Sequence, residues 1–153
     1  MDKLEYIPGD LVMTNGVSGG TAKDVVYRVV LSDPSRIFVL DDGTVLKGIV
    51  RLENLEDAKL EDEGYLYYGS SYVYSKDIIP IHLTPEILEK NGWEKPDGFD
   101  SYWLNKIGLL QEGDTWHSAL GSTKNAITLG NILYVHQLQH LLFGLELNSE
   151  MEV

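Results

Sequence analysis

Residues 76–93, KDIIPIHLTPEILEKNGW, contain the signals for a strand, for a helix and for both ends of that helix. The apolar run at 78–81 is typical of a short strand or extended arm. Thr84 and Pro85 predict a helix start, because the threonine hydroxyl can accept from a backbone N–H and proline suits the first helical position. Gly92 predicts the helix end. The chain reads as mostly β on both sides of this segment.

Length and composition bound the fold class. The chain has 153 residues, of which 43% are hydrophobic and 24% charged, as in an ordinary globular protein of one domain or two small ones. It has no cysteine, which excludes disulfides and thiolate metal sites. No apolar leader follows Met1, and no run approaches the ~18 apolar residues of a membrane span. We therefore expect a cytoplasmic protein without a membrane partner.

The net charge is −12. An acidic surface repels phosphate backbones, so we expect no direct binding to nucleic acid. Two interpretations of the charge remain open. It can serve solubility through self-repulsion, or it can attract a basic partner protein.

The first half of the chain contains short β-branched runs separated by turn residues. The runs are 25–31, 36–40, 44–47 and 49–52. Asp33-Pro34-Ser35 predicts a turn between the first two runs. Asp42-Gly43 predicts a type I′ hairpin between the next two. This spacing favours an SH3-like small β-barrel or a curled sheet over residues 1–75.

The second half, residues 76–153, is expected to hold the capped helix, an antiparallel β meander and a C-terminal helix, packed as one compact body. The candidate strands are 102–104, 107–110, 115–120 and 126–129. Leucines then recur at helical spacing and predict a helix over about 134–145. The fold class is therefore α+β. The leucine face of this last helix should be buried, which turns His136, Gln137 and His140 away from the core or toward a groove.

Five tyrosines fall within residues 65–74, YLYYGSSYVY. Aromatic side chains favour strands, and they also form adaptable binding surfaces. The tyrosines of this segment can therefore line a sheet and its edge, or form a platform for a ligand.

His136 and His140 are four residues apart, the spacing at which two histidines on one helix bind a metal ion. A third ligand would have to come from His82, His117 or a carboxylate. The glutamate of an HExxH motif is missing, and no P-loop motif occurs. Such a histidine pair also occurs as ordinary hydrogen-bonded surface residues. We therefore predict no catalytic residue, no metal and no cofactor.

Two segments carry a resemblance. Residues 79–93, IPIHLTPEILEKNGW, and residues 134–143, YVHQLQHLLF, resemble a group of small uncharacterised proteins of Bacteroides-type gut bacteria and their phages or prophages. Those proteins carry "PIPLTPEILEKNGF" and "YVHQLQNLYFAL", and His82 and Trp93 depart from that pattern. The resemblance implies a phage or prophage origin and a bacterial cytoplasm, and it supplies no activity.

The function predicted from these observations is a non-enzymatic binding protein. By analogy with small phage proteins, it would act in counter-defence, by occupying a host protein or by sequestering a small host signal such as a nucleotide. The alternatives are a metal-dependent enzyme that uses His136 and His140, and a virion structural or assembly protein. A homo-oligomer is possible.

The predicted binding residues lie in the second half, where aromatic rings could wall a groove beside the last helix. They are Trp103, Trp116, Tyr134, His136, Gln137 and His140. Both tryptophans could instead fill the core.

Overall fold

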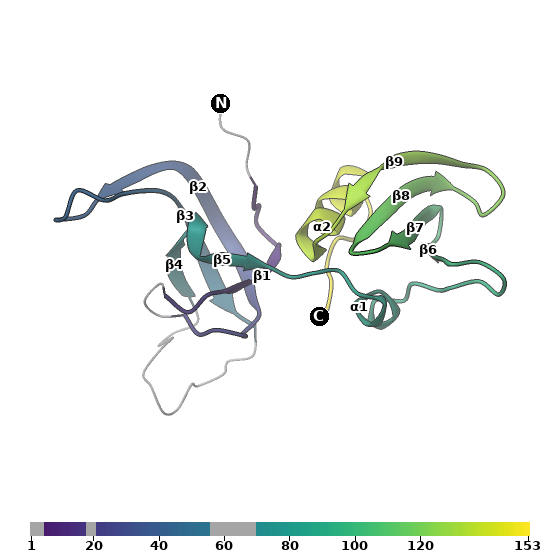
Figure 1. The fold of residues 1–153 in the computed structure, drawn as a ribbon, viewed down its shortest axis with the longest axis horizontal. Coiled ribbons are helices and arrows are strands. Elements are labelled where there is room, and N and C mark those ends of the chain that lie inside the picture. Colours follow the sequence, from purple (N-terminus) through teal and green to yellow (C-terminus); the bar gives the residue numbers. More distant parts are fainter. Residues whose placement is uncertain (1–4, 18–20, 56–69) are drawn as a thin grey trace. The chain divides into compact units, whose positions relative to one another are not determined.

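The computed structural model describes residues 5–17, 21–55 and 70–153. Its internal contacts divide the chain into two units, unit 1 (Met1–Ile81) and unit 2 (His82–Val153) (Figure 1). The sequence placed this boundary after Ser75. The difference arises because the strand at Ile78–Pro80 pairs with a strand near the N-terminus, which joins it to unit 1. No helix in the part of the chain that the structure describes is long and apolar enough to cross a membrane.

Unit 1 contains an antiparallel five-stranded sheet with the order β4-β3-β2-β1-β5. The strands are β1 (Leu11–Thr14), β2 (Tyr27–Val39), β3 (Val45–Asn54), β4 (Ser70–Tyr74) and β5 (Ile78–Pro80). A single 3₁₀ turn, Ser75–Asp77, links β4 to β5. The α+β class is thus confirmed together with unit 2, but the sheet is open over the described residues. The SH3-like barrel is not confirmed.

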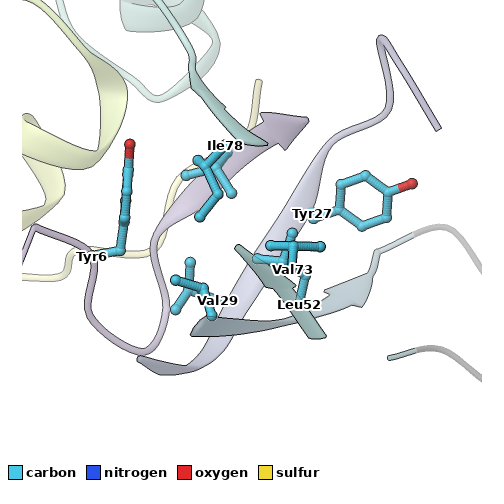
Figure 2. Packing of buried hydrophobic residues seen from close by; sticks show 8 residues of the cluster. Tyr6, Tyr27, Val29, Leu52, Val73 and Ile78 are labelled. Atoms are coloured by element: carbon cyan, nitrogen blue, oxygen red, sulfur yellow. The ribbon is translucent and has the colours of Figure 1, made fainter. Parts of the chain in front are cut away.

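One face of this sheet forms the core of unit 1. Val29 of β2, Leu52 of β3 and Val73 of β4 lie together there, with Tyr27 and Ile78 at either side (Figure 2). Val50 and Leu52 alternate along β3 with residues of the other face, as the two-residue period of a strand requires. The Tyr27 hydroxyl accepts from the Ala22 N–H at 2.9 Å, so this buried ring keeps a polar partner.

Strand β2 runs through Asp33-Pro34-Ser35, where the sequence predicted a turn, so that prediction was wrong. The pairing of β2 with β3 shifts register between Asp33 and Ile37, and this irregularity accommodates the proline without ending the strand. β4 pairs with β3 only from Ile49 to Glu53. The outer parts of β2 and β3 therefore pair only with each other within the described sheet. They form a two-stranded arm, residues 36–47 (Figure 1).

The tip of the arm also differs from the prediction. A type I′ turn needs positive φ at both central residues, and of Asp42 and Gly43 only Gly43 has it, at +83°. The Leu40 N–H donates to the Thr44 carbonyl at 2.9 Å, which closes a three-residue loop over 41–43. The Asp42 carboxylate accepts from the Thr44 N–H, also at 2.9 Å. The hairpin itself is confirmed.

Unit 2 contains a second antiparallel sheet with the order β6-β7-β8-β9, preceded by helix α1 (Pro85–Lys90) and followed by helix α2 (Val135–Gly144). The strands are β6 (Ser101–Leu104), β7 (Ile107–Glu112), β8 (Thr115–Gly121) and β9 (Ala126–Ile132). These elements confirm the predicted meander and C-terminal helix. Leu88, Leu109, Trp116 and Leu138 are among the side chains buried in this unit.

Helix α1 begins and ends as its sequence predicts. The Thr84 hydroxyl accepts from the Ile87 N–H at 3.3 Å, and Pro85 occupies the first helical position. The Trp93 N–H returns to the Leu88 carbonyl at 3.0 Å, which places the buried Trp93 against the last turn.

Thr84→Ala should lower the free energy of unfolding by about 0.5–2 kcal/mol, because it removes the acceptor at the helix start. Denaturant unfolding of the full chain, followed by circular dichroism, measures this loss. Thr84→Ser keeps the hydroxyl and should match the parent. Equal midpoints for the alanine and serine variants would show that the cap contributes nothing.

Candidate functional site

The two tryptophans predicted to bind a ligand have different surroundings in unit 2. Trp116 is 0% exposed, and its Nε1–H donates to the Leu83 carbonyl at 3.0 Å. Its ring meets the edge of Tyr102 at 5.9 Å. Trp116 is therefore a core residue with no exposed surface for a ligand. Trp103 is half-buried, and its Nε1–H donates to the Ser101 hydroxyl at 2.8 Å.

Three of the other predicted residues, Tyr134, His136 and His140, are connected by ring contacts along the first half of α2. The Tyr134 ring meets that of His82 edge to face at 5.0 Å and stacks on that of His136 at 5.8 Å, both measured between ring centres. His140 follows at 5.6 Å from His136. His136 is only 3% exposed, although the leucine spacing had turned it away from the core. Helix α2 thus buries a wider face than its leucines predict.

Gln137 has a structural role at the same helix start. Its Oε1 accepts from the backbone N–H groups of Leu133 and Tyr134, at 2.8 and 3.1 Å. These two contacts satisfy backbone donors that the helix cannot pair internally. The side-chain oxygen of Gln137 is therefore occupied by capping.

Within the described residues, the predicted metal site of His136 and His140 has no third ligand. Among the described residues, no group of three histidine, aspartate or glutamate side chains is arranged to hold a metal ion. Both ring nitrogens of His117 already have partners, Asn131 at 2.7 Å and Glu112 at 2.6 Å. His136 and His140 contact each other as rings, and no carboxylate or third imidazole in the described structure completes a site with them.

A different site lies on unit 1, on the sheet face opposite the core. We call it the outer groove, a pocket of about 540 Å³. It is lined by Leu31, Asp33, Arg36, Phe38, Ile49, Tyr72, Val73 and Tyr74. Its base follows from the strand register, which places Asp33 across from Ile49 and Ile49 across from Tyr74. Ile49 is only 9% exposed.

The bend of the arm supplies one wall of the outer groove. Phe38 belongs to the arm, yet its ring meets the edge of Tyr74 at 6.0 Å. This contact forms because the irregular pairing between Asp33 and Ile37 turns β2 at this point, opposite Gly48. Phe38 and Tyr74 pack in the edge-to-face geometry that aromatic rings prefer.

Arginine is concentrated around this face. The chain contains only three arginines, Arg28, Arg36 and Arg51. The Arg36 guanidinium lies 5.8 Å from the Phe38 ring centre, and that of Arg51 lies 5.8 Å from the Tyr72 ring centre. Arg28 instead forms an ion pair with Glu53 at 3.2 Å. Two cation–π pairs therefore flank the groove of a protein whose net charge is −12.

Asp33 is the acidic residue of the lining. The Ser35 hydroxyl, which donates to the Asp33 carboxylate at 2.6 Å, holds the pKa of that carboxyl below its ordinary value. The Ser35 backbone N–H, at 3.1 Å, and the positive charge of Arg36 lower this pKa further. Asp33 is thus an ionised hydrogen-bond acceptor at neutral pH.

The sequence indicated part of this site. Tyr72 and Tyr74 belong to the tyrosine-dense segment that was open to interpretation as a ligand platform, and Tyr65, Tyr67 and Tyr68 lie outside the described residues. Arg36 and Phe38 were read only as part of a hairpin. Their role depends on a bend in β2 that local sequence did not predict.

Comparisons with protein-family models, with curated proteins and with solved structures found no match to this chain.

Proposed function

We propose that this chain is a non-enzymatic binding protein that captures a small anionic molecule in the outer groove. The observation that carries the proposal is the pair of arginines over aromatic rings, in a chain that is otherwise strongly acidic. Arginine over a ring combines a fixed positive charge with planar apolar surface. Such a pair suits a ligand that has both a negative charge and a flat apolar part.

The size and composition of the groove support a small ligand. A pocket of about 540 Å³ falls within the range of roughly 300–1,000 Å³ typical of small-molecule sites. Its lining is mainly aliphatic and aromatic, with a few polar groups, which is also typical of such sites. The exposed rings already stand at the surface, with Phe38 at 38% and Tyr72 at 56% exposure.

The lining supports binding more than catalysis. It contains one carboxylate, one guanidinium and two phenols, and no serine, histidine or lysine. A nucleophile beside a general base, the arrangement that covalent catalysis needs, does not occur among these lining residues. The phage or prophage setting that the resemblance implies then favours sequestration of a host signal molecule in counter-defence.

Phe38→Ala should reduce capture about tenfold, because it removes ring surface together with the contacts that orient Arg36 and Tyr74. The intact chain is purified from bacterial cells and denatured, and the small molecules it releases are quantified by mass spectrometry. Val39→Ala is the matched control, since Val39 is 68% exposed on the same arm and does not line the groove. Equal release from both variants would place capture elsewhere.

A further inference from the structure

We propose that the ligand of the outer groove is a purine nucleotide, with its phosphate on Arg36, its base against the aromatic rings and a base N–H donating to Asp33. This inference rests on the proposed function and names the chemical class of its ligand. Three features of the groove carry it, namely its rings, its single arginine and its single carboxylate.

The rings offer stacking surface for a flat base. Phe38, Tyr72 and Tyr74 line the groove above the buried Ile49, and Tyr72 is more than half exposed. Stacking of a nucleobase on an aromatic side chain contributes on the order of 1–3 kcal/mol for each base. A fused two-ring base covers more of this surface than a single ring does. The aromatic lining therefore favours a purine.

The cations match a phosphate. Arg36 is exposed, and among the described residues no carboxylate lies within ion-pair distance of its guanidinium. A guanidinium binds phosphate oxygens through two parallel N–H donors. The bend that carries Arg36 lies beside the row of Ile49 and Tyr74 in the strand register. The next row on the same face joins Leu31 to Arg51 and Arg51 to Tyr72. Arg36 is therefore the cation of the lining, beside the apolar base of the groove.

Asp33 favours the binding of a nucleotide over that of other aromatic anions. An ionised carboxylate beside an anion site repels the ligand unless the ligand also offers a donor. Adenine and guanine carry amino groups, and guanine carries a ring N–H next to its amino group. One oxygen of Asp33, Oδ1, accepts from Ser35, which fixes the side chain in place. A purine base supplies the donor that a simple aromatic acid lacks.

The charge of the chain limits the ligand to a free nucleotide. A nucleic-acid strand brings a run of phosphates against a protein of net charge −12, and binding of such strands depends on neutralising several phosphates. A mononucleotide brings one phosphate to one arginine. We therefore expect GMP or AMP to bind and single-stranded DNA not to bind at physiological salt.

Calorimetric titration of the intact chain with GMP and AMP tests the inference. Three probes divide the ligand into parts, namely guanosine without phosphate, ribose 5-phosphate without base, and phenyl phosphate with a ring that has no N–H donor. A nucleotide should bind at least tenfold more tightly than each of the three. Arg36→Gln should weaken nucleotide binding about 10- to 100-fold, because it removes a charge-assisted contact. Asp33→Asn should remove the preference for GMP over phenyl phosphate.

Arg28→Gln is the matched control, since Arg28 lies on the same sheet and is paired with Glu53 outside the groove lining. It should leave nucleotide affinity unchanged, and melting curves confirm that all variants fold. Phenyl phosphate binding as tightly as GMP would overturn the purine assignment and leave the proposed function standing. If no nucleotide binds but the purified chain releases another small molecule, the purine assignment is likewise overturned and the proposed function stands. If no nucleotide binds and the purified chain releases no small molecule, the proposed function is overturned as well.

Discussion

Trp116→Ala should lower the free energy of unfolding of unit 2 by about 3–5 kcal/mol. The ring is 0% exposed and meets the edge of Tyr102, so its removal leaves a cavity in the core of this unit. The change also removes the indole N–H that donates to the Leu83 carbonyl. Leu83 precedes helix α1, so the loss should weaken the connection between that helix and the sheet.

Urea unfolding followed by far-ultraviolet circular dichroism measures this effect without depending on tryptophan fluorescence. Trp103→Ala is the control of the same type, because Trp103 is half-buried and its indole donates to the neighbouring Ser101. It should cost clearly less than Trp116→Ala. If the two variants unfold at the same urea concentration, Trp116 is not the central residue of this core.

Local sequence signals were sufficient to predict most helices and strands of unit 2. The threonine and proline before α1, the glycine after it, and the leucine spacing of α2 each act through neighbouring residues. Strand ends at glycine and asparagine turns are local as well. Where the prediction differed, tertiary packing decided the outcome. His136 is polar, yet it is buried, and its ring stacks on that of Tyr134.

The arm of unit 1 could not be predicted in the same way. Asp33-Pro34-Ser35 has the composition of a turn, and only pairing with β3 shows that the strand continues through it. The outer groove depends on that pairing. Phe38 and Tyr74 are far apart in the sequence, and they meet only because the bend and the register of β3 with β4 bring them to one face. A tyrosine-rich segment indicated binding surface, but its arginine partners came from other strands.

Gly48→Ala should destabilise unit 1 and weaken ligand capture together. Gly48 lies opposite the bend of β2 with φ at +73°, a conformation that costs other residues about 1–3 kcal/mol. An added Cβ would also lie 2.6 Å from the Ser75 Oγ and 3.6 Å from the Pro34 Cα. The Pro34 distance is an ordinary contact, so relief of the overlap requires movement of Ser75, which adds about 1–3 kcal/mol. Ser75 directly follows Tyr74, so its movement shifts Tyr74 away from Phe38 and weakens the wall of the groove.

Gly43→Ala separates the two causes. Gly43 has a similar φ, +83°, but a Cβ there would meet no atom within 4 Å. Gly43→Ala should therefore show only the backbone cost and should retain ligand capture. Adding Ser75→Ala to Gly48→Ala removes the hydroxyl oxygen and should recover stability and binding in part. Urea unfolding gives the stability of each variant, and mass spectrometry of released small molecules gives its capture. Equal losses of both in Gly43→Ala and Gly48→Ala would contradict this prediction, because the crowding at Ser75 would then have no effect on the groove.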